Sequence, residues 1–105
     1  MTRKINLSER ADAELTELEN NPRLAGLFKQ VVKTLALLET NTKHPGLHTH
    51  KFSSMMGADG EEVFEAYVQN NTPGAYRIFW HYGPDEIAGK KRLPVISILA
   101  ITSHP

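Results

Sequence analysis

Three of the five histidines in this 105-residue chain lie within seven positions of one another. They are His44, His48 and His50, in the stretch KHPGLHTHKFSS. In an extended segment His48 and His50 would point the same way, and neutral imidazoles so placed suit zinc or nickel. No fixed fourth ligand is evident, and the same stretch is typical of a polar surface loop or of part of a ligand site. We expect no functional metal and no cofactor here.

A second set of reactive side chains comes from two alternating segments and the C-terminal end. Arg77 and His81 share one face of a strand, about 13 Å apart at roughly 3.3 Å per residue. Tyr67 belongs to the preceding segment, and His104 could lie near both. Arginine binds phosphate, histidine exchanges protons near neutral pH, and tyrosine donates a proton or stacks on a base. The candidate catalytic residues are therefore Arg77, His81, His104 and Tyr67.

The same positions have a simpler interpretation as a solvated outer face of a sheet. Glu65 lies on the segment that carries Tyr67, and it could pair with Arg77 across two strands. Such a pair contributes under about 1 kcal/mol and implies no chemistry. Both interpretations stay open at this point.

Basic side chains are gathered in parts of a chain whose net charge is zero. Residues 21–58 carry a net charge of +4 and residues 87–105 a net charge of +3. A neutral total argues against strong non-specific binding to nucleic acid, which needs a basic excess. Local contact with a phosphate backbone is still open to Lys51 and to the cluster Lys90, Lys91 and Arg92, although solvated surface charge explains them equally well.

Two helices are predicted in the N-terminal half. Leu7, Ala11, Leu15 and Leu18 recur at helical spacing behind a capping pair that begins at Asn6. A broader apolar stripe follows between residues 24 and 38. It consists of Leu24, Leu27, Phe28, Val31, Val32, Leu35 and Leu38. The short connection between them predicts an antiparallel helical hairpin.

Three strands are predicted after residue 61. Residues 62–69 and 75–82 alternate between apolar and polar, and residues 95–102 are almost wholly apolar. Residues 41–61 are predicted as a loop with a brief extended piece, and RKINL as a fourth, N-terminal edge strand. The fold class is α+β: one domain over residues 1–105, with a helical hairpin packed on one face of a small antiparallel meander.

The composition restricts the class of protein further. The chain has no cysteine, and therefore no disulfide framework, thiolate metal site or cysteine nucleophile. No apolar run approaches the roughly 18 residues of a membrane span, and the N-terminus lacks the apolar run of a signal peptide. We expect a soluble, cytoplasmic protein with no membrane partner.

The order of these elements resembles the RelE/ParE superfamily of bacterial toxins. The stretches that carry the resemblance run along nearly the whole chain: INLSERADAELTEL, HKFSS, GAYRIFWHYGPDE and ISILAITSHP. The resemblance implies a toxin of a type II toxin–antitoxin system. RelE-like members cut mRNA on the ribosome without a metal, whereas ParE-like members inhibit DNA gyrase, and both are held inactive by an antitoxin that wraps the fold.

The resemblance also implies where a nuclease site would lie. In RelE-like nucleases, basic side chains on the sheet face away from the helices stabilise charge on the scissile phosphate, and the RNA 2′-hydroxyl is the nucleophile. Arg77 matches this pattern, whereas Glu65 and Tyr67 stand where active members carry lysines, and His104 stands in place of an arginine. The resemblance in architecture implies a ribosome-dependent mRNA endoribonuclease, whereas the departures at Glu65 and Tyr67 and the neutral charge favour an alternative. The alternative is a catalytically inactive RelE-fold protein that acts by binding an antitoxin, a nucleic acid or a second copy of itself.

Overall fold

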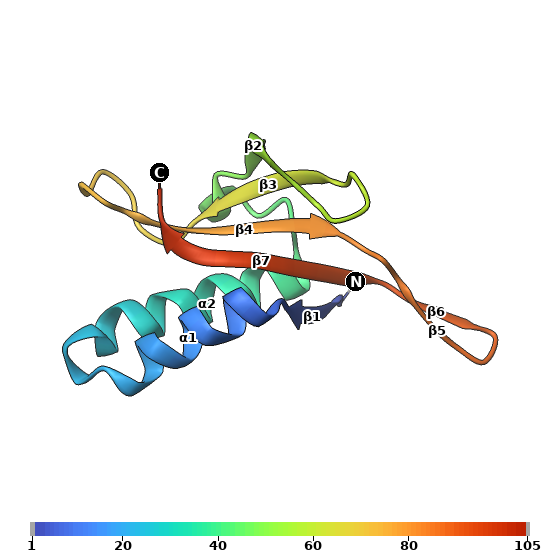
Figure 1. Ribbon diagram of the computed structural model, residues 1–105, viewed down its shortest axis with the longest axis horizontal. Helices are drawn as coiled ribbons and strands as arrows, with labels where there is room; N and C mark the ends of the chain where they lie inside the picture. Colours follow the sequence, from blue (N-terminus) through green and yellow to red (C-terminus); the bar gives the residue numbers. More distant parts are fainter. Residues whose placement is uncertain (1, 105) are drawn as a thin grey trace.

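The computed structural model describes residues 2–104 and contains two layers (Figure 1). Two helices, α1 (Glu9–Asn20) and α2 (Ala25–Thr40), lie side by side under one face of a five-stranded sheet. The α+β class and the helical hairpin predicted from the sequence are confirmed. None of the helices in the described part of the chain is long and apolar enough to cross a membrane.

The sheet has the order β1-β7-β4-β3-β2. Its strands are β1 (Lys4–Leu7), β2 (His50–Met56), β3 (Glu62–Tyr67), β4 (Tyr76–Tyr82) and β7 (Val95–Ser103). The predicted meander is formed by β3, β4 and β7, which are antiparallel neighbours, and the predicted N-terminal strand is the edge strand β1, parallel to β7. The sheet is therefore mixed, and it has one strand more than the sequence predicted.

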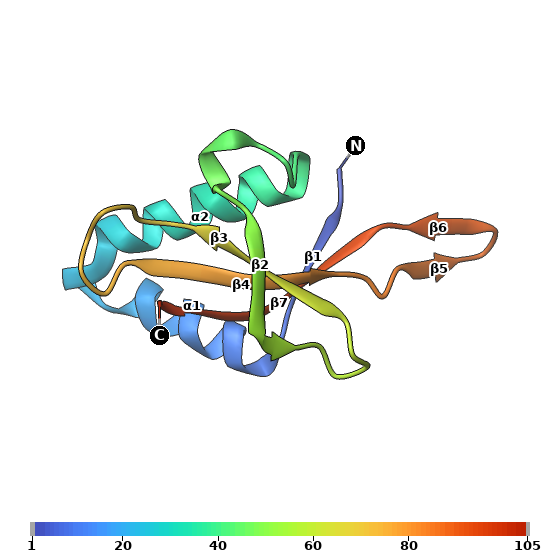
Figure 2. The ribbon, with the colours of Figure 1, turned by 90° about the horizontal axis from the view of Figure 1, so that it is seen from above.

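The additional strand is β2, which begins in the segment predicted to be a loop. It pairs with β3 at His50 and Lys51, and its register then shifts before Met56. Because of this irregularity Phe52 and Met55 both turn inward at a spacing of three, and the strand lacks the two-residue alternation of a regular strand. In Figure 2, β2 crosses over β3 and β4 on the side of the sheet away from the helices.

Two apolar clusters lie on opposite faces of the sheet. The larger joins the helices to the sheet through buried residues that include Leu18, Val31, Leu38, Ile78 and Trp80. The smaller consists of Val63, Phe79 and Ala100 on the other face, with Phe52, Met55 and Leu99 packed against it. The outer face of the sheet is therefore partly covered by β2, which the sequence did not predict.

Short segments complete the chain. Two 3₁₀ helices, η1 (Pro22–Leu24) and η2 (Pro45–Leu47), flank α2, and the strands β5 (Glu86–Ala88) and β6 (Lys91–Leu93) form a separate hairpin. Figure 1 shows this hairpin projecting away from the two layers. The cap of α1 differs from the prediction: Ser8 Oγ accepts the Ala11 N–H at 3.0 Å, while Asn6 is part of β1.

Candidate active site

A buried carboxylate lies at the centre of the polar residues on the outer face. Glu65, in the middle of β3, points away from the helices, and its side chain is only 3% exposed. It stands opposite Phe79 on β4, so it forms no direct cross-strand pair with Arg77. A carboxylate removed from water needs compensating partners. Here His50 contacts Oε1, and His104 lies at ion-pair distance from Oε2, which has no hydrogen-bond partner among residues 2–104.

The first imidazole is that of His50, which β2 places across from Glu65 in the sheet register. Its Nε2 contacts Glu65 Oε1, and its Nδ1 lies 2.9 Å from the backbone carbonyl oxygen of His48. Both partners accept hydrogen bonds, so both contacts are hydrogen bonds only when each ring nitrogen carries a proton. With both nitrogens engaged, His50 acts as a fixed support for the carboxylate.

The second imidazole is that of His104, just beyond the end of β7. Its backbone N–H donates to the Ala75 carbonyl at 2.9 Å, which holds this end of the chain against the start of β4. Its Nδ1 lies 3.2 Å from Glu65 Oε2, and its side chain is 45% exposed. Nδ1 faces the carboxylate, and Nε2 is the ring nitrogen left for a substrate. A carboxylate behind an accessible imidazole is the arrangement that orients histidine for proton transfer.

A stacked cation from β4 lies beside Tyr67, the residue two positions along β3 from Glu65. The guanidinium carbon of Arg77 sits 3.6 Å from the centre of the Tyr67 ring, its neighbour in the register. Its Nη1 donates to the carbonyl oxygens of Gln69 at 2.6 Å and Tyr76 at 3.1 Å. Its buried Nε has no hydrogen-bond partner within residues 2–104. Arg77 lies on the face expected for it, but it is buried to 8% exposure, not open to solvent.

The histidines of the KHPGLHTH stretch have three different positions. His44 caps η2 by accepting the Gly46 N–H at its Nδ1, at 2.9 Å. His48 has a left-handed backbone (φ +47°), and its ring centre lies 5.1 Å from that of Tyr67. His50 also borders Tyr67, at 5.6 Å. Within residues 2–104 no group of three or more histidine and carboxylate residues is arranged to hold a metal ion.

The structure does not bring His81 to this cluster. Its Nδ1 lies 2.9 Å from the Tyr82 carbonyl oxygen, and its ring, in a residue 4% exposed, borders a separate recess of about 270 Å³ shared with Asp59 and Glu61. The pKa of Glu61 is lowered, chiefly by the backbone N–H groups of Glu61 and Asp59 and to a lesser extent by the charge of His81. The four candidate catalytic residues thus divide into three near Glu65 and one elsewhere.

The candidate nucleic-acid-binding residues occupy two places. Lys51 on β2 pairs with Glu62 at 2.7 Å, and this hydrogen bond and charge raise the pKa of Lys51. Lys90, Lys91 and Arg92 lie at the β5–β6 hairpin, where Arg92 pairs with Asp85 at 3.1 Å. Lys90 and Lys91 form no ion pair with any other part of the described chain.

Sequence reasoning missed the two residues that organise the cluster. Glu65 was interpreted only as a departure from the lysine of active members, yet the structure places it between His50 and His104. The signal that could have identified it is the position of Glu65 in the interior of the strand EVFEAY, between the apolar residues Phe64 and Ala66. His50 could not be assigned to the same site because the brief extended piece predicted within residues 41–61 was not expected to pair with β3.

The fold belongs to a known class of α+β proteins, the RelE-like fold. The structure resembles the YoeB dimer from Staphylococcus aureus, with a TM-score of 0.61 and 12% sequence identity over 100% of both chains. No protein-family model matches the sequence, and no curated protein matches it. At this level of identity the similarity establishes the fold alone.

Proposed function

We propose that residues 1–105 form a single RelE-family toxin domain that cleaves RNA without a metal, with Glu65, His104 and Arg77 as its central residues. The fold is that of YoeB, a RelE-family toxin. The observation that carries the proposal is the buried Glu65 carboxylate behind His104, with the stacked Arg77 guanidinium on the same face.

The chemistry follows from what each side chain can do. His104 Nε2 takes the proton of the RNA 2′-hydroxyl, Glu65 stabilises the imidazolium that results, and the 2′-oxygen attacks the adjacent phosphorus. The bond from phosphorus to the 5′-oxygen breaks, and the leaving oxygen takes a proton from water. The products are a 2′,3′-cyclic phosphate and a 5′-hydroxyl end.

The remaining residues of the site support this step. The positive charge of Arg77 favours the phosphorane-like transition state, which carries more negative charge than the ground state. Tyr67 holds the guanidinium plane and offers its ring as a stacking partner for a base. We assign His81 no role in the step, because it lies in a different recess.

The partners follow from the same proposal. An antitoxin protein, and mRNA on the ribosome, are the partners implied for such a toxin, with Lys51, Lys90, Lys91 and Arg92 as phosphate contacts. The similar YoeB structure is a dimer, so we propose self-association for this chain as well. A cytoplasmic location is part of the proposal, since ribosomes and mRNA are found there.

The test compares purified wild-type protein with His104→Ala and Glu65→Gln on ribosome-bound mRNA and on naked RNA. We expect cleavage that is unaffected by a chelator, ends in a 2′,3′-cyclic phosphate, and falls at least about 100-fold in both variants, as is usual when a proton-transfer group is lost. Lys29→Ala is the control, because Lys29 lies on the exposed surface of α2, outside the cluster. Equal cleavage by wild type and His104→Ala would contradict the mechanism.

One observation favours a second candidate, a protein that binds but does not cleave. Glu65 is 3% exposed and both of its oxygens face imidazoles, so the cluster also serves to fasten β2 and the end of β7 to β3. If the protein binds without cleaving, bacteria that express either the wild type or Glu65→Gln should grow normally, and neither protein should cut RNA. Growth arrest that Arg77→Ala relieves would support the toxin.

A further inference from the structure

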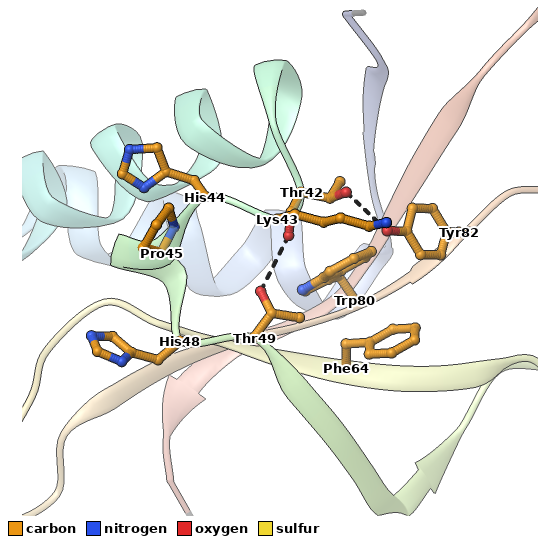
Figure 3. Close-up of a pocket in the computed structure, with 9 residues that line it drawn as sticks. All are labelled: Thr42, Lys43, His44, Pro45, His48, Thr49, Phe64, Trp80 and Tyr82. Carbon is orange, nitrogen blue, oxygen red and sulfur yellow. Dashed lines mark hydrogen bonds between the residues drawn. The ribbon is translucent and has the colours of Figure 1, made fainter.

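A second concave site lies on the opposite side of the sheet from Glu65. A pocket of about 550 Å³ opens between the segment that follows α2 and the ends of β3 and β4 (Figure 3). Its wall is aromatic: Phe64, Trp80 and Tyr82 lie together, with ring centres 5.0 Å apart for Phe64 and Trp80 and 4.9 Å apart for Trp80 and Tyr82. Small-molecule sites commonly have this size and an apolar wall.

Hydrogen bonds hold the other side of the pocket in place. Thr42 and Tyr82 join their hydroxyls at 2.8 Å, and the Thr49 hydroxyl donates to the Thr42 carbonyl at 3.4 Å, as the dashed lines in Figure 3 show. The segment from Thr42 to Thr49 is therefore hydrogen-bonded to β4 at Tyr82, and its two ends are hydrogen-bonded to each other.

The pocket contains a hydrogen-bond donor without an acceptor. Trp80 is fully buried, and its Nε1 has no hydrogen-bond partner among residues 2–104. Figure 3 shows Nε1 pointing toward the segment that carries Pro45 and Thr49. A buried N–H normally has a partner, so a ligand with a carbonyl or ring-nitrogen acceptor would complete this site.

The ionisable residues that line the pocket are basic, apart from Tyr82. Lys43 reaches over Trp80 toward Tyr82 in Figure 3 and forms no ion pair with the rest of the described chain. His44 and His48 also line the pocket, and no acidic residue does. An aromatic wall, an unpaired donor and a free cation together fit a planar base that carries a phosphate.

We propose that this pocket binds a nucleotide, with the base against the aromatic wall and the phosphate at Lys43. The accessible rings of Phe64 and Tyr82 supply stacking. Because Trp80 Nε1 is buried, the segment over it shifts so that the base carbonyl or ring nitrogen can accept from it. The nucleotide is either a free mononucleotide or one unit of an RNA strand, since both present the same base and phosphate. This pocket is separate from the Glu65 cluster. The proposal that it binds a nucleotide does not depend on whether the outer face cleaves RNA.

Trp80 is the only tryptophan of the chain, so its fluorescence reports directly on the pocket. The protein is titrated with each 5′-ribonucleoside monophosphate, with ribose 5-phosphate, and with a short single-stranded RNA. We expect a saturable change in tryptophan emission with monophosphates and none with ribose 5-phosphate. Tighter binding of the RNA identifies a strand as the ligand, and equal or weaker binding identifies the free nucleotide.

Two exposed lysines provide the matched variants. Lys43→Ala should weaken nucleotide binding about tenfold through loss of a charge-assisted hydrogen bond, whereas Lys29→Ala, on the exposed surface of α2, should leave it unchanged. No saturable change at millimolar nucleotide, or identical affinity in wild type and Lys43→Ala, would overturn the inference.

Discussion

At the scale of single residues, the chemistry of the outer face depends on how Glu65 is surrounded. The carboxylate is buried to 3% exposure, between His50 from β2 and His104 from the end of β7. A buried charge of this kind is tolerated only because partners compensate for lost hydration. The three side chains therefore work as one unit, and removal of one changes the state of the other two.

Glu65→Gln should lower the free energy of unfolding by about 1–3 kcal/mol, because an amide cannot offer both imidazoles a charged acceptor. The measurement is denaturant unfolding of Glu65→Gln, His50→Ala and the double variant. The losses should not add, because each single change disrupts the same contact. Strictly additive losses would show that Glu65 and His50 are energetically independent.

At the scale of elements, the candidate active site on the outer face depends on β2. This strand carries His50, and it is held against the sheet by Phe52, whose ring centre lies 4.8 Å from that of Phe79. Phe52 also borders the His104 ring at 6.1 Å. The same aromatic side chain thus packs the strand and contacts one of the proposed catalytic groups.

Phe52→Ala should lower the free energy of unfolding by about 2–3 kcal/mol, somewhat less than for a fully buried phenylalanine because Phe52 is half-buried. It should also reduce RNA cleavage, since β2 would hold His50 less firmly. Met56→Ala, on the same strand but 71% exposed, is the control and should change stability by less than about 0.5 kcal/mol. A Phe52→Ala protein as stable as Met56→Ala would show that β2 is not held by this packing.

The β5–β6 hairpin is tied to β1 by ionic contacts. The carboxylate of Glu86 accepts from Lys4 Nζ at 3.1 Å and from Asn6 Nδ2 at 3.3 Å, and these hydrogen bonds, with that of Lys4 the larger, lower the pKa of Glu86. Because the pKa of Glu86 is lower in the folded state than in the unfolded state, its contacts stabilise the fold fully at pH values above the unfolded-state pKa. This stabilisation is lost as the pH falls through the folded-state pKa.

Lys4→Ala should therefore raise the pKa of Glu86 toward its ordinary value, and Lys33→Ala, on α2, should not. The measurement is an NMR titration of the glutamate side-chain carboxyl resonances from neutral to acid pH. Wild-type Glu86 should titrate at a lower pH than a free glutamate. An unchanged midpoint in Lys4→Ala would mean that the contact is absent in solution.

At the scale of the whole molecule, positive charge is presented at a projecting tip, while the total charge is zero. Lys90 and Lys91 lie at the β5–β6 hairpin, away from the helices and the main sheet (Figure 1). A protein that contacts RNA phosphates through such groups releases counterions, and its affinity then depends on salt.

Lys90→Ala combined with Lys91→Ala should reduce the slope of log affinity against log salt by about 1.4, at roughly 0.7 per phosphate contact on single-stranded RNA. The measurement is RNA binding by fluorescence anisotropy at several salt concentrations. Lys29→Ala combined with Lys33→Ala removes the same charge from α2 and should leave the slope unchanged. Equal slopes in the two double variants would remove the hairpin from the RNA contact surface.

The sequence by itself determined the helical hairpin and the β3–β4–β7 meander, because both are encoded by local periodicity. It indicated the edge strand β1 only through the short stretch RKINL. It also determined that Arg77 lies on the opposite face of β4 from Ile78 and Trp80, since alternation along a strand fixes the relative face of each residue. Only the tertiary structure decided that β2 crosses the outer face and that Glu65 meets His50 and His104. The reason is that an irregular register hides β2 from local patterns, and contacts between residues far apart in the chain are set by packing.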